Sequence, residues 1–139
     1  MTIEPTASFW DCPEFISCAE KLQVGHPPGA PFYMLVGNLF TQFRGIASVL
    51  AGEFSNALLS AGCILFLFWS ITRLVRSLIV NEEQNLSTID VIVILGSGFV
   101  GALAYTFSDT FWFSAVEGEV YAFSSFLTAL VFWMILRWQ

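Results

Sequence analysis

Three long runs of apolar residues follow residue 53, and none of them contains a charged side chain. They cover residues 54–72, 91–108 and 120–136. About 19 residues of helix at about 1.5 Å each reach about 28 Å, close to a hydrocarbon core of about 30 Å. When each run is arranged as a helix, apolar side chains lie on all of its faces. A helix on the surface of a soluble protein has them on one face only. The pattern predicts an all-α, polytopic transmembrane protein with spans at about 54–76, 90–108 and 111–137.

The few basic residues predict how these spans are oriented. Arg73 and Arg76 follow the first span, and Arg137 follows the third. Because cytoplasmic loops carry an excess of Lys and Arg, both of these ends are expected in the cytoplasm. Residues 1–53 then form an extracytoplasmic loop region, and the turn 109–119 lies on the same outer side.

A shorter apolar stretch, residues 31–43, precedes the first span. It is too short to cross a bilayer and contains Asn38 and Gln42, so we interpret it as a helix on the membrane surface. In the alternative, residues 31–52 cross the membrane with Arg44 buried, at a cost of a few kcal/mol.

Composition supports a membrane location and excludes one class of partner. The 139 residues are 56% hydrophobic and only 12% charged. A soluble domain carries about 25% charged residues. The formal net charge of −6 leaves no basic patch for phosphates, so nucleic acid is not an expected partner.

The three cysteines do not predict a disulfide framework or a zinc site. Cys63 lies within an apolar run and suits helix packing, while Cys12 and Cys18 are six residues apart. On a helix these two face different sides, so only a non-helical loop would let them form a disulfide. With His26 as the single histidine, no common zinc motif is present.

Two carboxylates and one histidine in the outer region are candidates for chemistry. Asp11 and Glu14 follow Trp10, and on a helix their spacing places both on one face. Aromatic surroundings raise a carboxyl pKa toward that of a general acid or base. The alternative is a helix start, with Asp11 as cap, Pro13 in the first turn and Glu14 completing a capping box.

His26 lies in a turn rich in proline and glycine, with the sequence GHPPGAP over residues 25–31. Proline restricts the backbone of the residue before it, so His26 is held in an extended conformation. A histidine held in this way can donate a hydrogen bond to a phosphate or a sugar hydroxyl. An exposed histidine at a helix entry explains the pattern equally well.

A third group of polar residues precedes the last span. Glu117 and Glu119 lie at its head, between Trp112 and Tyr121. Acids are favourable at a helix N-terminus for structural reasons alone. At the edge of the hydrocarbon, the free-energy cost of placing a charged side chain is large enough to indicate a function. The neighbouring aromatic faces suit stacking on a sugar ring.

These motifs resemble those of a known family of membrane enzymes. The strings are FWDCPEF, KLQVGHPPGAPFYMLVGNLF and GALAYTFSDTFWFSAVEGEVYAFSSFLTALVFW, and together they cover nearly the whole chain. They are similar to the N-terminal region of DUF2723 proteins. These form glycosyltransferase family 117 and are related to protein O-mannosyltransferases of the GT-C type.

The resemblance implies an inverting glycosyltransferase with an extracytoplasmic site, located in a bacterial inner membrane. Its donor substrate would be a polyprenyl-phosphate sugar embedded in the membrane lipid. Its acceptor would be a Ser or Thr hydroxyl of a protein. By resemblance, Asp11 is the base and Glu14 its catalytic neighbour. The residues expected to bind substrate are Trp10, His26, Glu117, Glu119 and Tyr121. No metal ligand or cofactor is assigned, and metal dependence stays open.

The chain also departs from that family pattern. Relatives usually have another span before the Trp-Asp motif and continue through many spans after the third. Residues 1–5 have neither the basic start nor the apolar stretch of a signal peptide. We therefore expect an N-terminal fragment or a wrongly assigned start, and in either case a chain that is inactive on its own. The alternative function is a non-catalytic polytopic subunit or a transporter-like protein that uses its acids to bind a partner or an ion.

Overall fold

The computed structural model describes residues 11–26, 29–42, 48–79, 86–116 and 120–138. Within these ranges every regular element is a helix, which confirms the all-α prediction. The helices are α1 (Cys12–Lys21), α2 (Pro31–Thr41), α3 (Ser48–Ile79), α4 (Thr88–Thr106), α5 (Asp109–Val116) and α6 (Val120–Trp138). Pro31 starts α2, where a missing N–H costs nothing.

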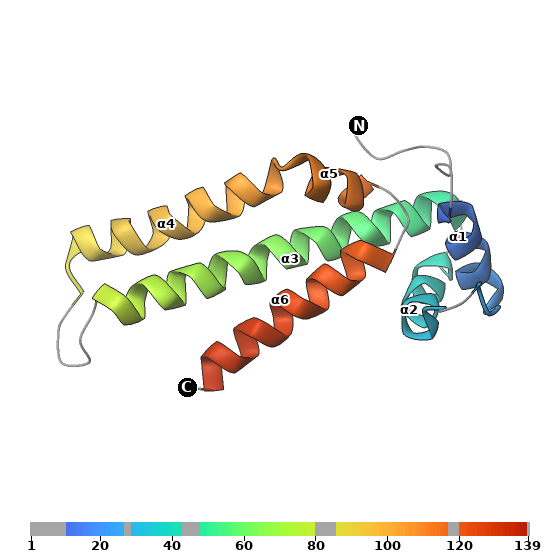
Figure 1. The fold of residues 1–139 in the computed structure, drawn as a ribbon, viewed down its shortest axis with the longest axis horizontal. Coiled ribbons are helices and arrows are strands. Elements are labelled where there is room, and N and C mark those ends of the chain that lie inside the picture. The colour runs from blue at the N-terminus through green and yellow to red at the C-terminus, as the bar shows by residue number, and fades with distance from the viewer. Residues whose placement is uncertain (1–10, 27–28, 43–47, 80–85, 117–119, 139) are drawn as a thin grey trace.

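Helix α3 is the centre of the arrangement. Helices α4 and α6 both pack along it, while α1 and α2 lie together at its N-terminal end (Figure 1). Three helical segments are long and apolar enough to cross a membrane: Gly52–Ile79, Thr88–Thr106 and Val120–Trp138. The chain is therefore an integral membrane protein by the length and composition of these helices.

Two boundaries differ from those predicted. Helix α3 starts at Ser48, so residues 48–53 belong to the long helix and not to a separate loop region. The predicted range 111–137 covers two helices, because α5 ends at Val116 and α6 starts at Val120. An eight-residue helix reaches about 12 Å, so α6 alone is long enough to span.

The short apolar stretch before the first span forms a helix of its own. Helix α2 has 11 residues, and a helix of that length reaches about 16 Å. The alternative, in which one helix crosses the membrane from residue 31 to residue 52, is therefore not the arrangement in the structure. The location of α2 at the membrane surface stays a prediction.

Glycine allows α4 to approach α3 closely. A Cβ added at Gly98 would lie 2.5 Å from a methyl carbon of Thr72 and 3.0 Å from the ring of Phe68. A Cβ added at Gly101 would lie 2.6 Å from Ile71. Small residues that bring helix backbones together replace the hydrophobic driving force that is missing in lipid.

We predict that Gly98→Ala destabilises the helix pair by about 1–3 kcal/mol, because neither a branched threonine nor a phenyl ring can yield without a backbone shift. Gly96→Ala is the matched control, since a Cβ there meets nothing within 4 Å. It is expected to be neutral or stabilising by up to about 1 kcal/mol, from helix propensity. The free energy of unfolding in mixed micelles measures the effect of each substitution. Equal free energies for the two variants would contradict the packing argument.

Aromatic rings hold α6 against α3. Phe66 and Trp69 of α3 contact Trp133 of α6, with ring centroids 5.3 and 5.4 Å apart. Near the C-terminal ends of both helices, the Arg73 Nε donates a hydrogen bond to the carbonyl of Leu136. Arg137 lies over the Trp133 ring at 5.4 Å. Both arginines are thus at one end of the bundle, while the side of the membrane that this end faces stays a prediction.

Candidate functional site

Helix α1 begins with the acidic motif, but not as a capping box. Asp11 occupies the N-cap position, yet its side chain makes no cap hydrogen bond in the structure described. The Glu14 carboxylate reaches the neighbouring loop instead of the helix backbone. The predicted Asp11–Glu14 capping box is therefore wrong. A complete capping box occurs at the start of α4, between Ser87 and Asp90.

The chain between α1 and α2 folds back over α1. It leaves the helix through Leu22 in a left-handed conformation, with φ of 50°. A Cβ added at Gly25 would lie 3.3 Å from Glu14 Oε1 and 3.5 Å from Met34, so glycine leaves room for a close approach. The Gly29 N–H donates to the His26 carbonyl at 2.9 Å and closes a turn. Residues 27–28 of the predicted His-Pro-Pro turn lie outside the described residues.

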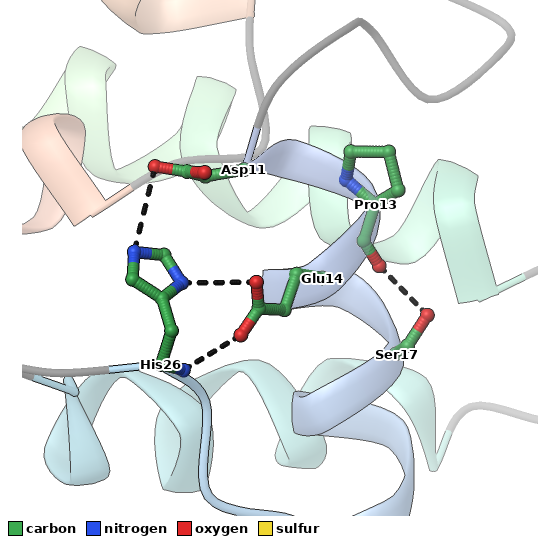
Figure 2. A network of polar contacts seen from close by, with 5 residues as sticks. All are labelled: Asp11, Pro13, Glu14, Ser17 and His26. Carbon is green, nitrogen blue, oxygen red and sulfur yellow. Dashed lines mark hydrogen bonds and ion pairs between the residues drawn. The ribbon is translucent and has the colours of Figure 1, made fainter.

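The result is a cluster of three side chains, which we call the Asp11–Glu14–His26 cluster (Figure 2). Glu14 accepts two hydrogen bonds from His26, from the backbone N–H at 2.7 Å and at the ring Nδ1, 2.9 Å away. The other ring nitrogen, Nε2, faces Asp11, and its distance to Oδ2 is 3.8 Å. The imidazole thus lies between the two carboxylates, anchored by one and directed at the other.

The charges of the cluster influence its protonation. The hydrogen bonds from the His26 backbone and ring lower the pKa of Glu14. The hydrogen bond and the negative charge of Glu14, with a smaller contribution from Asp11, raise the pKa of His26 above 6.5. The ion pair is therefore complete at pH values between the lowered Glu14 pKa and the raised His26 pKa. It is lost as the pH falls below the first or rises above the second.

We expect Glu14→Gln to lower the pKa of His26, because the charge and the strongest acceptor facing Nδ1 are removed together. NMR titration of the imidazole, the single histidine of the chain, gives this pKa without ambiguity. The matched control is Glu20→Gln, an exposed position in the last turn of the same helix. An unchanged His26 pKa in Glu14→Gln would show that the two side chains do not meet in solution.

Buried polar contacts attach α1 and α2 to α3. The Cys12 thiol, one residue after Asp11, donates to Glu53 Oε1 at 3.4 Å. The Tyr33 hydroxyl donates to Asn56 Oδ1 at 3.2 Å. Cys12, Glu53 and Asn56 are completely buried, so these contacts form in a region from which water is excluded. The Asp11–Glu14–His26 cluster is therefore carried by a structure fixed to a membrane helix.

A second set of contacts joins α1 to α2. The Asn38 side chain donates to the carbonyls of Ala19 and Glu20 at the end of α1, where helical partners are missing. The Phe15 ring packs edge-on against Tyr33, with centroids 5.8 Å apart, and lies 6.3 Å from the His26 ring. The loop that carries His26 is thus held between two docked helices.

The structure brings together three of the predicted site residues. These are Asp11, Glu14 and His26. Tyr121 is exposed in the first turn of α6 and takes no part in the contacts that form the cluster. The others, Trp10, Glu117 and Glu119, lie outside the described residues.

Buried polar residues of α3 were not recognised from the sequence. Glu53, Asn56 and Ser60 are spaced by three and four residues, which puts them on one face of the helix. This spacing at the head of an apolar run was the available signal. None of the three cysteines, all of which lie in the described part of the chain, forms a disulfide. Cys12 and Cys18 both lie on α1, so the helical geometry considered for them holds.

The cluster also has the donors that a divalent cation prefers. Asp11, Glu14 and His26 each offer one ligand atom, and these atoms lie within 4.8 Å of one another. Two carboxylate oxygens and an imidazole nitrogen suit Mn²⁺ or Zn²⁺. Exposed acidic groups gather in this way without a metal as well, so no catalytic step is assigned to one.

The fold and the cluster define a helical integral membrane protein with an acidic, histidine-containing site at one end of its spans. The chain belongs to the family described as protein O-mannosyl-transferase TMEM260 N-terminal domain, whose family model matches residues 11–139. This confirms the predicted relation to O-mannosyltransferases, whereas the assignment to DUF2723 and glycosyltransferase family 117 stays a prediction.

A curated relative is similar over nearly the whole chain. It is the protein O-mannosyl-transferase tmem260 of Dictyostelium discoideum, which is 23% identical over 137 residues. The match covers 96% of this chain and 15% of the relative, so the chain corresponds to a small part of that protein. No solved structure matches the chain.

Proposed function

We propose that this chain is the N-terminal part of a membrane glycosyltransferase. It would transfer a sugar from a polyprenyl-phosphate donor to a protein hydroxyl on the extracytoplasmic side. Two findings support the proposal: the family membership and the Asp11–Glu14–His26 cluster at the end of the spans. The name of the Dictyostelium relative points to mannose as the sugar and to protein as the acceptor.

Asp11 is proposed as the general base. Its carboxylate is about half exposed at the start of α1, where an acceptor can reach it. The acceptor oxygen forms a bond to the anomeric carbon, and the bond between that carbon and the phosphate oxygen breaks. The proton of the hydroxyl passes to Asp11, and the lipid phosphate leaves with the bonding electrons. One direct displacement inverts the anomeric configuration.

His26 is proposed to stabilise the departing phosphate. Its raised pKa favours the imidazolium form, which presents an Nε2–H donor 3.8 Å from Asp11. A fixed donor at the point where negative charge develops lowers the barrier more than one that must reorient. Glu14 then acts as a positioning residue, because it holds the backbone and the Nδ1 of His26 and leaves Nε2 directed at the reaction.

The remaining predicted residues complete the proposal. Trp10, Glu117, Glu119 and Tyr121 are proposed to bind substrate next to the cluster. The outer side of a bacterial inner membrane is the proposed location, while the similar curated protein is eukaryotic. Neither proposal affects the assignment of Asp11 or His26.

The direct test is sugar transfer by the full-length protein that contains this chain. Purified protein in nanodiscs, supplied with a radiolabelled polyprenyl-phosphate mannose and a Ser/Thr-rich peptide, is expected to yield labelled peptide. If the protein binds the donor but transfers no sugar to any acceptor tried, the alternative of a non-catalytic subunit is favoured. The control is the same sugar supplied as a nucleotide sugar, which should not react.

We expect residues at the two ends of α3 to be accessible from opposite sides of the membrane. Val24→Cys marks the cluster side and Leu78→Cys the arginine side, and both positions are largely exposed. The native cysteines are buried, so a membrane-impermeant maleimide should report the introduced ones. Labelling of Val24→Cys from outside, and of Leu78→Cys only after lysis, is expected. The opposite pattern would invert the proposed topology.

A further inference from the structure

A small apolar pocket lies between the N-terminal half of α3, the C-terminal end of α4 and helix α5. Its volume is about 190 Å³. Alanine, isoleucine, phenylalanine and valine side chains make up most of its walls, together with Ser60, Thr106 and Trp112. Helix α5 therefore forms one wall of a recess that opens beside the main membrane helix.

Ser60 gives this pocket a polar group with no partner. The residue is 4% exposed, and its Oγ finds no hydrogen-bond partner among the described residues. Thr106, by contrast, donates to the carbonyl of Ala102. A buried donor left without an acceptor costs free energy, so Ser60 is suited to a ligand that brings an oxygen into an otherwise apolar space.

The ends of the neighbouring helices indicate that the pocket lies where a bilayer changes from hydrocarbon to polar groups. Helix α4 ends at Thr106 and α5 begins at Asp109, so the apolar span finishes beside the pocket. Trp112 is partly exposed, as is usual for tryptophan at a membrane interface. A ligand at this level has its chain in the hydrocarbon and its oxygen atoms next to water.

The size of the pocket favours a ligand with a single chain. A cavity of about 150 Å³ takes one benzene ring. The volume of about 190 Å³ is therefore enough for a five-carbon isoprene unit, and too small for the paired chains of a diacyl lipid. A polyprenyl phosphate has one such chain, with a phosphate ester oxygen directly after the first isoprene.

The pocket is also in line with the cluster. Glu53 and Ser60 are seven residues apart, which is two helical turns, or about 10 Å on the same face of α3. Glu53 accepts from the thiol of Cys12, next to Asp11. The phosphate, the anomeric carbon bonded to it and the acceptor oxygen would lie in the interval between Ser60 and Asp11.

We infer that this pocket binds the first isoprene unit of a polyprenyl phosphate, with the Ser60 hydroxyl donating to the phosphate ester oxygen. The identity of the lipid rests on the proposed function, while the pocket and its unpaired hydroxyl do not. The occupant is the donor itself and not bulk phospholipid.

The test is photo-crosslinking of the chain in nanodiscs. The probe is a polyprenyl phosphate with a diazirine in its first isoprene unit. Labelled peptides are expected from residues 57–64 and 111–116. Ala115→Phe fills the pocket and is expected to reduce labelling about tenfold or more, as for the loss of a binding site. Ala104→Phe makes the same change at an exposed position of α4 outside the pocket and should not reduce it.

Ser60→Ala tests the hydroxyl separately. Loss of one hydrogen bond to a charged phosphate is expected to weaken competition by unlabelled polyprenyl phosphate about tenfold. Ser70→Ala is the matched control, because this buried serine of α3 donates to the carbonyl of Phe66 and should leave binding unchanged.

Three outcomes would overturn the inference: no labelling of these peptides, equal labelling in Ala115→Phe, or equal competition by phosphatidylglycerol. Sugar transfer by the full-length protein separates the two proposals. Labelling at the pocket without transfer would contradict the glycosyltransferase function. Transfer that persists in Ala115→Phe with an unchanged KM for the donor would contradict the pocket alone.

Discussion

Asp11→Asn is expected to lower sugar transfer by the full-length protein by about 10²–10⁴-fold, the usual contribution of a general base. The amide keeps the size of the side chain but cannot accept the proton of an acceptor hydroxyl. Asp11 makes no cap hydrogen bond with α1, so the change should leave the fold intact. Initial rates at saturating donor, together with the thermal stability of the variant, measure both effects.

Asp109→Asn is the matched control for Asp11→Asn. It removes an acid from the first turn of α5, outside the Asp11–Glu14–His26 cluster, and should leave the rate unchanged. Wild-type activity of the Asp11→Asn protein would remove Asp11 as the base. Loss of activity in both variants would point to the overall negative charge at this end of the protein instead.

His26→Asn is expected to reduce transfer by about 10²-fold, the typical effect of removing one donor that faces developing charge. An asparagine amide can occupy the position of Nδ1 and keep the contact with Glu14, but it has no group at the position of Nε2. Glutamine reaches that second position, so His26→Gln should recover part of the activity. This pair separates the anchoring of the loop from the role of Nε2.

The pH dependence gives an independent check on His26. If the imidazolium is the active form, wild-type transfer falls as the pH rises through the raised pKa of His26. Glu14→Gln lowers that pKa, so the alkaline decline should move to lower pH, and it should disappear in His26→Gln. An alkaline decline that is identical in all three proteins would exclude His26 as its origin.

The sequence predicted the membrane helices well because their signal is local. An uncharged run such as residues 54–72 is costly in water and has only one stable environment. The boundaries were less accurate where polar residues interrupt the pattern. Glu53 is charged at neutral pH in water, so it was placed outside the helix, while contacts with α1 bury it within α3.

The site could be predicted in part. The types and spacing of Asp11, Glu14 and His26 identified them as candidates, but spacing equally favoured a capping box at α1. The contact of Glu14 with His26 joins residues 12 apart and depends on how a glycine-containing loop folds back, which no periodicity reveals. Ser60 was also missed, because one serine in an apolar run is common and only its surroundings show that it lacks a partner.

The length of α3 links the site to the lipid composition. Its 32 residues form a rod of about 48 Å, against a hydrocarbon core of about 30 Å. A helix longer than the core adjusts to the membrane by tilting, and the tilt depends on bilayer thickness. Since the N-terminal end of the rod carries α1 and α2, a thicker bilayer is expected to reduce the tilt of the rod and to change the height of the carboxylates above the lipid surface. In the proposed transfer reaction, the length of the lipid chains would thereby set the distance between a soluble acceptor and a donor anchored in the bilayer.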